Sequence, residues 1–435
     1  MSMKRTNQIG LAWILLSCAI SIVWGSSLGP AATRWVDFKA VYYGTRCLLE
    51  HHNPYSQSEL DGVFQSEGRE SPLASLRDHV GVTLYVNVPA TFIIVVPFAL
   101  LPWGSAHVLW MTLTAGAFIL AALLMWSVAA NYAPDVSLFL MCILLANCEA
   151  IFAAGNTAGI VVCLCVVAVW CFLKKRFELA GVLCLSVSLA IKPHDAGLVW
   201  LFFLLAGGVY RKRALQSFFI TAVLGLSAVL WVSLVAPHWM QDWQTNLAAI
   251  ASHGGLNDPS LNSVTGRTGG MVIDLQSAIS VFRDDPRIYN PASYMVCGAL
   301  LLIWLVSTLR SRFSQSRAWF ALAVIVPLTM LVTYHRPWDA KLLMLTVPAC
   351  AMLWAEGGAI AGIALLLNGA AIVMTADLPL TIFTMLTNPI RIPITGFPGQ
   401  ILTVVLMRPV PFILLAMSIF YLWIYVRRDA ERGLP

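Results

Sequence analysis

Charged residues are scarce in this chain. Only 11% of its 435 residues are Asp, Glu, Lys or Arg, whereas 59% are hydrophobic. A soluble domain carries roughly a quarter charged residues, so the composition excludes a water-soluble fold. The sixteen Trp, many near the ends of apolar runs, suit side chains anchored at lipid headgroups. We therefore expect an all-α integral membrane protein that contacts membrane lipids.

The chain also lacks the motifs of soluble catalysis. It contains no Gly-x-Ser-x-Gly elbow, Walker loop or His-Glu-x-x-His pattern, which leaves hydrolase and ATP-driven chemistry without support. The ten cysteines are scattered and form neither a metal spacing nor a disulfide framework. The acidic pair Asp284 and Asp285 has no convergent third ligand, so no metal or other cofactor is expected. No basic footprint for nucleic acid is present.

Thirteen apolar segments are candidates for membrane crossings, since about 20 residues span ~30 Å of hydrocarbon. They are 9–28, 87–103, 106–130, 134–154, 157–173, 178–191, 195–209, 216–236, 291–309, 318–334, 341–355, 357–375 and 401–426. The pattern predicts a single domain over 1–435, a bundle with about 11 to 13 crossings. Segments 178–191 and 195–209 are short, which suits broken helices around a cavity.

The basic clusters set the expected orientation, because Lys and Arg favour the cytoplasmic side. This rule places the following loops and corners outside: 29–86, 155–156, 192–195, 237–290, 335–340 and 376–400. Three apolar segments separate the first outer loop from the corner at 155, yet an even number of crossings is required. Segment 87–103 contains three prolines and is the candidate for not crossing.

The first outer loop carries the first candidate for chemistry. Phe38 to Leu49 have the apolar spacing of one helix face, which predicts a helix lying along the membrane surface. Asp37 stands at its start, with Lys39 and Tyr43 nearby. A helix N-terminus favours an ionised carboxylate, which is able to accept a proton. A helix cap explains Asp37 equally well.

A second cluster follows the apolar run 318–334. His335, Arg336, Asp339 and Lys341 lie within seven residues at a membrane boundary. Ionisable groups are costly there unless they face water, pair or bind a ligand. Cations in this segment are suited to hold a phosphate at the headgroup level. The alternative is an interfacial loop with snorkelling side chains.

A third cluster lies between two short apolar segments. Lys192, His194 and Asp195 flank Pro193, where a broken helix would expose a cation and an imidazole to a cavity. A tight outer turn is the competing interpretation. Gly155 and Asn156 give a weaker signal, because this pair marks many turns.

These motifs resemble a known family. Asp37-Phe-Lys-Ala-Val-Tyr-Tyr-Gly, then Asn53-Pro-Tyr and the run from Pro89 to Pro102 are similar to the start of the polyprenyl-phosphate-mannose-type glycosyltransferases of family 87, in the GT-C superfamily. Asn156, Ile191-Lys192-Pro193 and Tyr334-His335 with Asp339 follow in the expected order. The resemblance covers about 30 to 350.

The resemblance implies a GT-C bundle with an outward cavity covered by the first outer loop. It implies transfer of a sugar, mannose or another hexose or pentose, from a polyprenyl-phosphate donor to a lipid or glycan acceptor. Asp37 would be the general base. His335, with Lys192, His194 or Arg336, would hold the leaving phosphate, since cations stabilise charge that develops in the transition state. Attack opposite the leaving group implies inversion of the anomeric configuration. A metal ion is not implied, because these cations would stabilise the leaving phosphate.

Two other classes remain as alternatives. A transporter or flippase would be expected to show an internal repeat and ionisable residues within its spans, and neither is evident in the sequence. A polymerase or ligase of polyprenyl-linked glycans would be expected to carry its site in a late outer loop. The cell membrane, with the active site on the non-cytoplasmic side, is the expected location.

Overall fold

The protein is described by a computed structural model, which defines residues 3–27, 35–66, 82–261, 272–376 and 396–430, together with 263 and 382. All regular elements in these ranges are helical. The expected all-α integral membrane fold is confirmed. Most of the expected outer loop 376–400, and the segments 67–81 and 264–271 of the other two outer loops, lie outside the described residues.

The first half of the chain forms twelve helices up to residue 251 within the described ranges. These are α1 (Met3–Ser27), α2 (Val36–Leu49), α3 (Gln57–Ser66), α4 (Ala90–Ala99), α5 (Trp103–Ala129), α6 (Pro134–Ala146), α7 (Glu149–Ala154), α8 (Ala158–Lys174), α9 (Glu178–Ile191), α10 (Pro193–Leu205), α11 (Gly208–Val235) and α12 (Trp239–Ala251).

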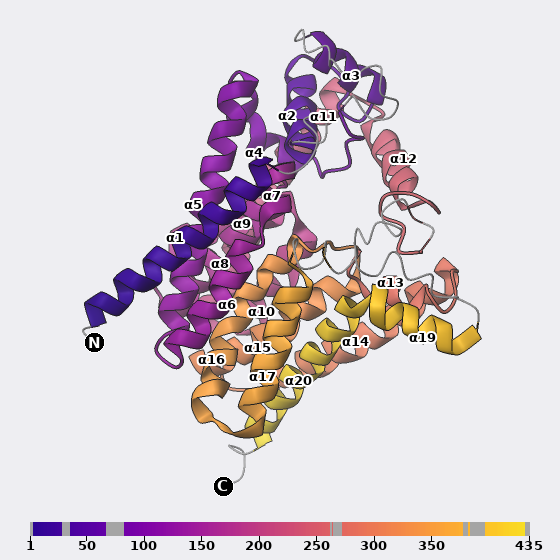
Figure 1. The fold of residues 1–435 in the computed structure, drawn as a ribbon. Coiled ribbons are helices and arrows are strands. Elements are labelled where there is room, and N and C mark those ends of the chain that lie inside the picture. The colour runs from indigo at the N-terminus through magenta and orange to yellow at the C-terminus, as the bar shows by residue number, and fades with distance from the viewer. Residues whose placement is uncertain are drawn as a thin grey trace.

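The second half packs beside and below this group (Figure 1). Its elements are α13 (Leu275–Ile279), α14 (Pro286–Arg310), α15 (Gln315–Val332), the 3₁₀ helix η2 (Asp339–Thr346), α16 (Val347–Glu356), α17 (Gly358–Met374), α19 (Gly396–Met407) and α20 (Pro409–Ala430).

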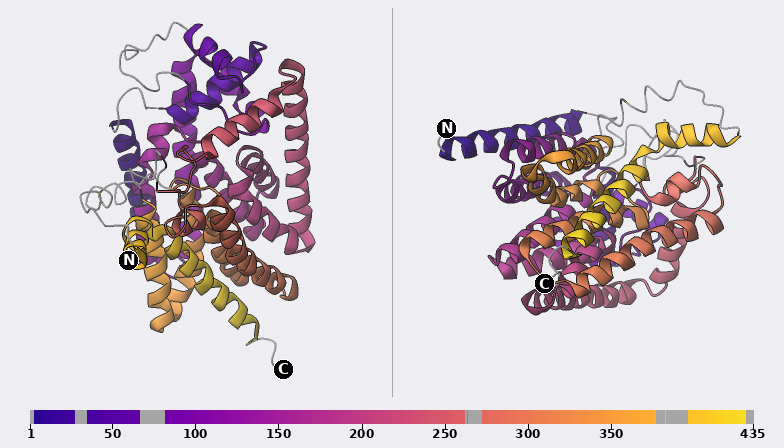
Figure 2. Two further views of the ribbon diagram at one scale, coloured as in Figure 1. Left: turned by 90° about the vertical axis from the view of Figure 1, so that its right-hand side faces the viewer. Right: turned by 90° about the horizontal axis from the view of Figure 1, so that it is seen from below.

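Seven stretches of described helix are long and apolar enough to cross a membrane, by length and composition. They are Gln8–Ser27, Trp103–Ala129, Pro134–Ala154, Gly208–Val235, Pro286–Arg310, Gln315–Val332 and Pro409–Arg428. Shorter apolar helices complete the bundle, and α1 lies along its edge when viewed from below (Figure 2). The chain is thus a multi-pass membrane protein, while the count of about 11 to 13 crossings stays a prediction.

Helix α4 bears on the number of early crossings. It has ten residues and is about 15 Å long at 1.5 Å per residue, half of the ~30 Å hydrocarbon thickness. Helix α4 alone is therefore too short for a full crossing. The candidate spans between α4 and the corner at 155 are α5, and α6 with α7, which agrees with the even number that the predicted orientation requires.

Two expected segments are broken in the structure. Segment 401–426 is divided between α19 and α20 at Pro409, because proline supplies no backbone N–H to continue the helix. Segment 341–355 is also divided, since it begins in η2 and continues in the ten-residue α16. The eight residues of η2 are all buried, so this irregular backbone is surrounded by protein, as membrane proteins require.

Helix α2 occupies the predicted range. The residues buried along α2 lie on more than one of its faces: Phe38, Ala40, Val41, Tyr42, Tyr43, Gly44, Thr45, Cys47 and Leu48. It packs against α3 and α4 at the upper end of the molecule in Figure 1. Its predicted place along the membrane surface stays a prediction.

Candidate active site

Asp37 lies in the first turn of α2 and is partly exposed. The Asn156 side-chain amide donates a hydrogen bond to its Oδ2 at 2.6 Å. The same amide accepts a hydrogen bond from the backbone N–H of Ala158 at 2.8 Å through Oδ1. Because its oxygen is used in this way, Asn156 presents its NH₂ group to the carboxylate. The two residues are 119 positions apart in the chain.

Gly155 permits this meeting of distant segments. Its φ of 65° lies in the left-handed region that glycine occupies readily. A Cβ at this position would come within 2.7 Å of the Cβ of Phe38. The Trp110 indole N–H donates a hydrogen bond to the Gly155 carbonyl oxygen at 3.1 Å. A glycine is therefore required for the corner to approach α2 and bring Asn156 to Asp37.

Lys192 lies at the break between α9 and α10. Its Nζ donates to Oδ1 of Asp339 at 2.7 Å and lies 4.0 Å from Oδ2 of Asp195. Burial lowers the pKa of Lys192, but the charges of Asp339 and Asp195 raise it more, so the net shift is upward. The ammonium thus stays protonated. The expected cation at a broken helix is present, held by two buried carboxylates.

His335 is fully buried, and both of its ring nitrogens face protein atoms. Nδ1 lies 2.8 Å from the carbonyl oxygen of Thr333, and Nε2 lies 3.2 Å from Oδ1 of Asp195. Burial lowers the pKa of His335, but Asp195 raises it more, so the net shift is upward. We expected His335 to contact a phosphate directly. In this arrangement the ring lies between Thr333 and Asp195 and directs neither nitrogen to open space.

Arg336 and His194 are the more accessible neighbours of this core. The guanidinium of Arg336 donates to the Tyr334 hydroxyl and, at 3.0 Å, to the carbonyl of Leu256 in the second outer loop. The ring of His194 lies 5.1 Å from that of His335, and its side chain is 37% exposed. These two groups are thus positioned to contact a ligand that enters from solvent.

Asp339 organises the turn that carries Arg336. Its Oδ2 accepts a hydrogen bond from the Arg336 backbone N–H at 2.8 Å, while Oδ1 accepts from Lys192. The side chain is 2% exposed. Lys341, two residues on, donates to the carbonyls of Asn147 and Thr375 and so ties helices together. Asp339 is a positioning residue, and Lys341 is structural.

Asp37 and the basic residues share one electrostatic environment. Burial raises the pKa of Asp37 above its ordinary value, and the Asn156 hydrogen bond lowers it. The charges of Arg336 and Lys192 also lower it, whereas that of Asp339 raises it. The charges carried by the α9–α10 break and by the segment after α15 thus influence the Asp37 carboxylate.

Lys39 and Tyr43 do not share the Asp37 face of α2. Residues two apart on a helix do not face each other, which separates Lys39 from Asp37. The Tyr43 ring is buried against Phe64 and stacks on Trp103, with a centroid distance of 5.8 Å. Tyr43 thus packs among the aromatic residues around α2. A role for Lys39 or Tyr43 in the site stays a prediction.

Three of these groups could hold a metal ion. His194, Asp195 and His335 each offer one ligand atom, and these atoms lie within 4.8 Å of one another. Two histidines and a carboxylate are a donor set that transition metals accept. Lys192 and His335 lie near the Asp195 carboxylate. Neither carboxylate oxygen of Asp195, nor Nε2 of His335, has a hydrogen-bond partner among the described residues.

A family model for glycosyltransferase family 87 matches residues 85–333, more than half of the chain. The chain belongs to glycosyltransferase family 87. No curated protein and no solved structure matches it. The matched range includes Asn156, Lys192 and Asp195. Asp37 lies well before its start at residue 85, and His335 lies just beyond its end at residue 333.

Asp195 is the residue of this glycosyltransferase that sequence reasoning undervalued. In the sequence it stands beside Lys192 and His194, and the pattern assigns it no role of its own. Its 1% exposed carboxylate lies within 4.0 Å of Lys192, His194 and His335. The position of Asp195 two residues after Pro193, at a helix break, is the sequence feature that could have indicated a role. A carboxylate at such a position must pair if it is buried.

Removing the amide of Asn156 tests the setting of Asp37 in this glycosyltransferase. In Asn156→Leu the carboxylate loses a hydrogen bond that favours its charged form, so its pKa rises further. Activity that depends on the ionised carboxylate should then fall at low pH, with the acidic limb of the pH–rate profile displaced to higher pH. Asn131→Leu, in an exposed turn, is the control. An unchanged acidic limb would separate Asn156 from the reacting group.

Proposed function

We propose that the protein transfers a sugar from a polyprenyl-phosphate donor to a hydroxyl group of a lipid or glycan acceptor. Mannose, or another hexose or pentose, is the proposed sugar. The reaction takes place at the non-cytoplasmic face of the cell membrane, where the proposed outer loops 29–86 and 237–290 meet the bundle. Family membership supports glycosyl transfer, and the site residues support this form of it.

The proposed chemistry is a single displacement. Asp37 takes the proton from the acceptor hydroxyl as the acceptor oxygen attacks the anomeric carbon. The bond from that carbon to the phosphate oxygen breaks, and its electron pair leaves with the phosphate. Lys192, Arg336 and His194 face the developing negative charge, and His335 adds positive charge behind them. Attack opposite the leaving group inverts the anomeric configuration.

The position of the site in the membrane suits such a donor. A polyprenyl tail stays in hydrocarbon, so its phosphate is available only at the headgroup level. The proposed site lies where ionisable groups gather at helix breaks, which membrane proteins tolerate around a cavity. Trp103 and Trp110 stack on Phe38, the residue after Asp37 in α2.

The observation that carries the proposal is the half-buried Asp37, hydrogen-bonded to Asn156, whose carboxylate is influenced by the charges of Lys192 and Arg336. The direct test uses purified protein and a panel of polyprenyl-phosphate sugars with candidate acceptors. The proposal expects transfer, or slow hydrolysis of the donor, with one sugar preferred and an inverted product. Use of a nucleotide sugar, with no reaction of any lipid-linked sugar, would refute it.

His335→Ala tests the buried positive charge. The variant loses the imidazole that faces Asp195, so we expect donor use to fall roughly 10- to 100-fold, the worth of a charged hydrogen bond. The measurement is kcat/KM for the lipid-linked sugar. His253→Ala, an exposed histidine of the second outer loop, is the control. Unchanged kinetics in His335→Ala would remove this residue from the donor site.

We propose that the reaction needs no metal ion, because Lys192, Arg336 and His335 supply positive charge. Dialysis against EDTA should therefore leave the transfer rate unchanged. The measurement is the rate before and after chelation, followed by readdition of single divalent cations. A loss that one cation restores would contradict the proposal.

A further inference from the structure

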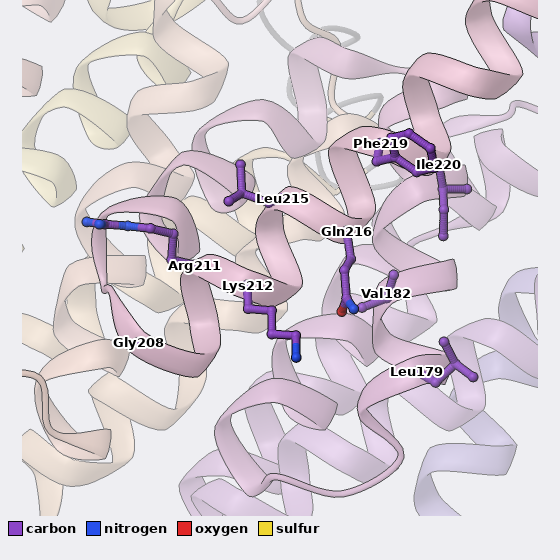
Figure 3. Close-up of a pocket in the computed structure, with 9 residues that line it drawn as sticks. All are labelled: Leu179, Val182, Gly208, Arg211, Lys212, Leu215, Gln216, Phe219 and Ile220. Atoms are coloured by element: carbon purple, nitrogen blue, oxygen red, sulfur yellow. The ribbon is translucent and has the colours of Figure 1, made fainter.

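A groove of 590 Å³ lies between α9 and α11, away from the site described above. Its walls include Leu179 and Val182 of α9 and Phe219 of α11. Figure 3 shows Lys212 and Gln216 extending from α11 toward the helix of Leu179 and Val182. The volume is in the range of small-molecule sites. The groove combines an apolar wall with a cation at one end.

The groove follows from how α9 and α11 pack. The hydroxyl of Ser186 donates to Ser217 O at 3.1 Å, and Thr221 donates to Ser186 O at 3.2 Å. Such small polar residues let membrane helices approach closely. The larger Leu215 and Phe219 remain outside this seam and are 51% and 69% exposed. Close packing at the seam thus leaves a furrow along its outer side.

The outer side of α11 faces lipid. Only 11% of the most apolar stretch of this 28-residue helix is buried inside the protein. A large exposed apolar surface on a membrane-crossing helix is covered by acyl chains, since lipid is the solvent there. The occupant of the groove is therefore expected to have an apolar chain.

The end of the groove near Lys212 is strongly basic. Helix α8 ends at Lys174, the turn that follows carries Lys175 and Arg176, and the basic run 211–213 lies in the first two turns of α11. The ion pair between Arg213 and Glu178 joins these two segments and neutralises the acidic residue. These basic clusters are those that the positive-inside rule assigns to the cytoplasmic leaflet.

The basic residues differ in their availability. Arg211 donates to the Leu204 carbonyl at 3.1 Å and in Figure 3 extends away from the groove. Arg213 is paired with Glu178. Lys212 is exposed and lines the groove. An anion at the groove end would thus be met by Lys212, with Lys175 and Arg176 on the neighbouring turn adding positive charge.

We propose that this groove binds an anionic phospholipid of the cytoplasmic leaflet. One acyl chain lies along Leu179 and Phe219, and the phosphate lies beside Lys212. Basic pockets between helices on this side of a membrane are suited to anionic headgroups. The site is independent of sugar transfer, because it uses none of the residues proposed for that reaction. Its ligand stabilises the protein without taking part in the chemistry.

The test is retention of defined lipids by the purified full chain. Phosphatidylglycerol and phosphatidylcholine with identical acyl chains are added in detergent, and bound lipid is counted by native mass spectrometry. We expect one phosphatidylglycerol to be retained in preference to phosphatidylcholine. Lys212→Gln should weaken its retention about fivefold, and Lys175→Gln by a similar factor, the effect of one surface charge on anionic lipid.

Arg310→Gln is the matched control, because Arg310 is an exposed basic residue at the end of another long helix, α14. Its phosphatidylglycerol retention should equal that of the unaltered protein. Equal retention of both lipids, or an equal loss in Arg310→Gln and Lys212→Gln, would overturn the proposal. Stabilisation by inorganic phosphate to the same extent would assign the site to a free anion and also overturn it.

Discussion

Asp37→Asn is expected to abolish sugar transfer while leaving donor binding intact. The amide keeps the shape of the side chain and can still accept the hydrogen bond from Asn156, but it cannot take a proton. General bases contribute roughly 10²- to 10⁴-fold to a rate, so kcat should fall by a factor in this range. Single-turnover transfer, and donor-induced thermal stabilisation of the same sample, measure the two properties separately.

Asp135→Asn is the control for Asp37→Asn. Asp135 is an exposed carboxylate in the first turn of α6, so it shares the helix position of Asp37 without its surroundings. The Asp135→Asn variant should transfer sugar at the rate of the unaltered protein. Transfer by Asp37→Asn within a few-fold of normal would show that another group accepts the proton.

Lys192→Gln is expected to destroy both activity and much of the stability. Asp339 is 2% and Asp195 1% exposed, and removing their common cation leaves buried carboxylates without it. Breaking a buried ion pair from one side costs about 3–5 kcal/mol. The variant should therefore unfold at a clearly lower temperature or denaturant concentration, and retain little transfer.

A second variant separates these two effects. In Lys192→Gln/Asp339→Asn the charge opposite residue 192 is removed as well, so much of the lost stability should return. Activity should not return, because the cation that faces the leaving phosphate is still absent. Recovery of transfer along with stability would mean that Lys192 acts only in folding.

The sequence predicted the members of the site better than their arrangement. Apolar run lengths located the helices, and a carboxylate and cations beside their ends marked α2, the break at Lys192 and the turn at Arg336. Gly155 and Asn156 gave only a turn signal. The contact of Asn156 with Asp37 depends on the close approach of two distant segments, which spacing along the chain does not encode.

Burial was the property least accessible from the sequence. The spacing from Phe38 to Leu49 describes one face of a helix, yet it does not show that α3 and α4 cover the others. The sequence around Asp195 is typical of a solvated turn. Its burial beside His335, 140 positions later in the chain, is visible only in the structure. Pro409 divides segment 401–426 into α19 and α20, but the long apolar run around it predicts one continuous helix.

The central claim is that the proton acceptor and the phosphate-holding cations act on one sugar in one site. It is tested most directly by a structure of the Asp37→Asn variant with a polyprenyl-phosphate sugar bound. The account predicts the phosphate beside Lys192 and Arg336, with the anomeric carbon between that phosphate and residue 37. A donor bound with its phosphate remote from both cations, or with residue 37 out of reach of the sugar, would contradict it.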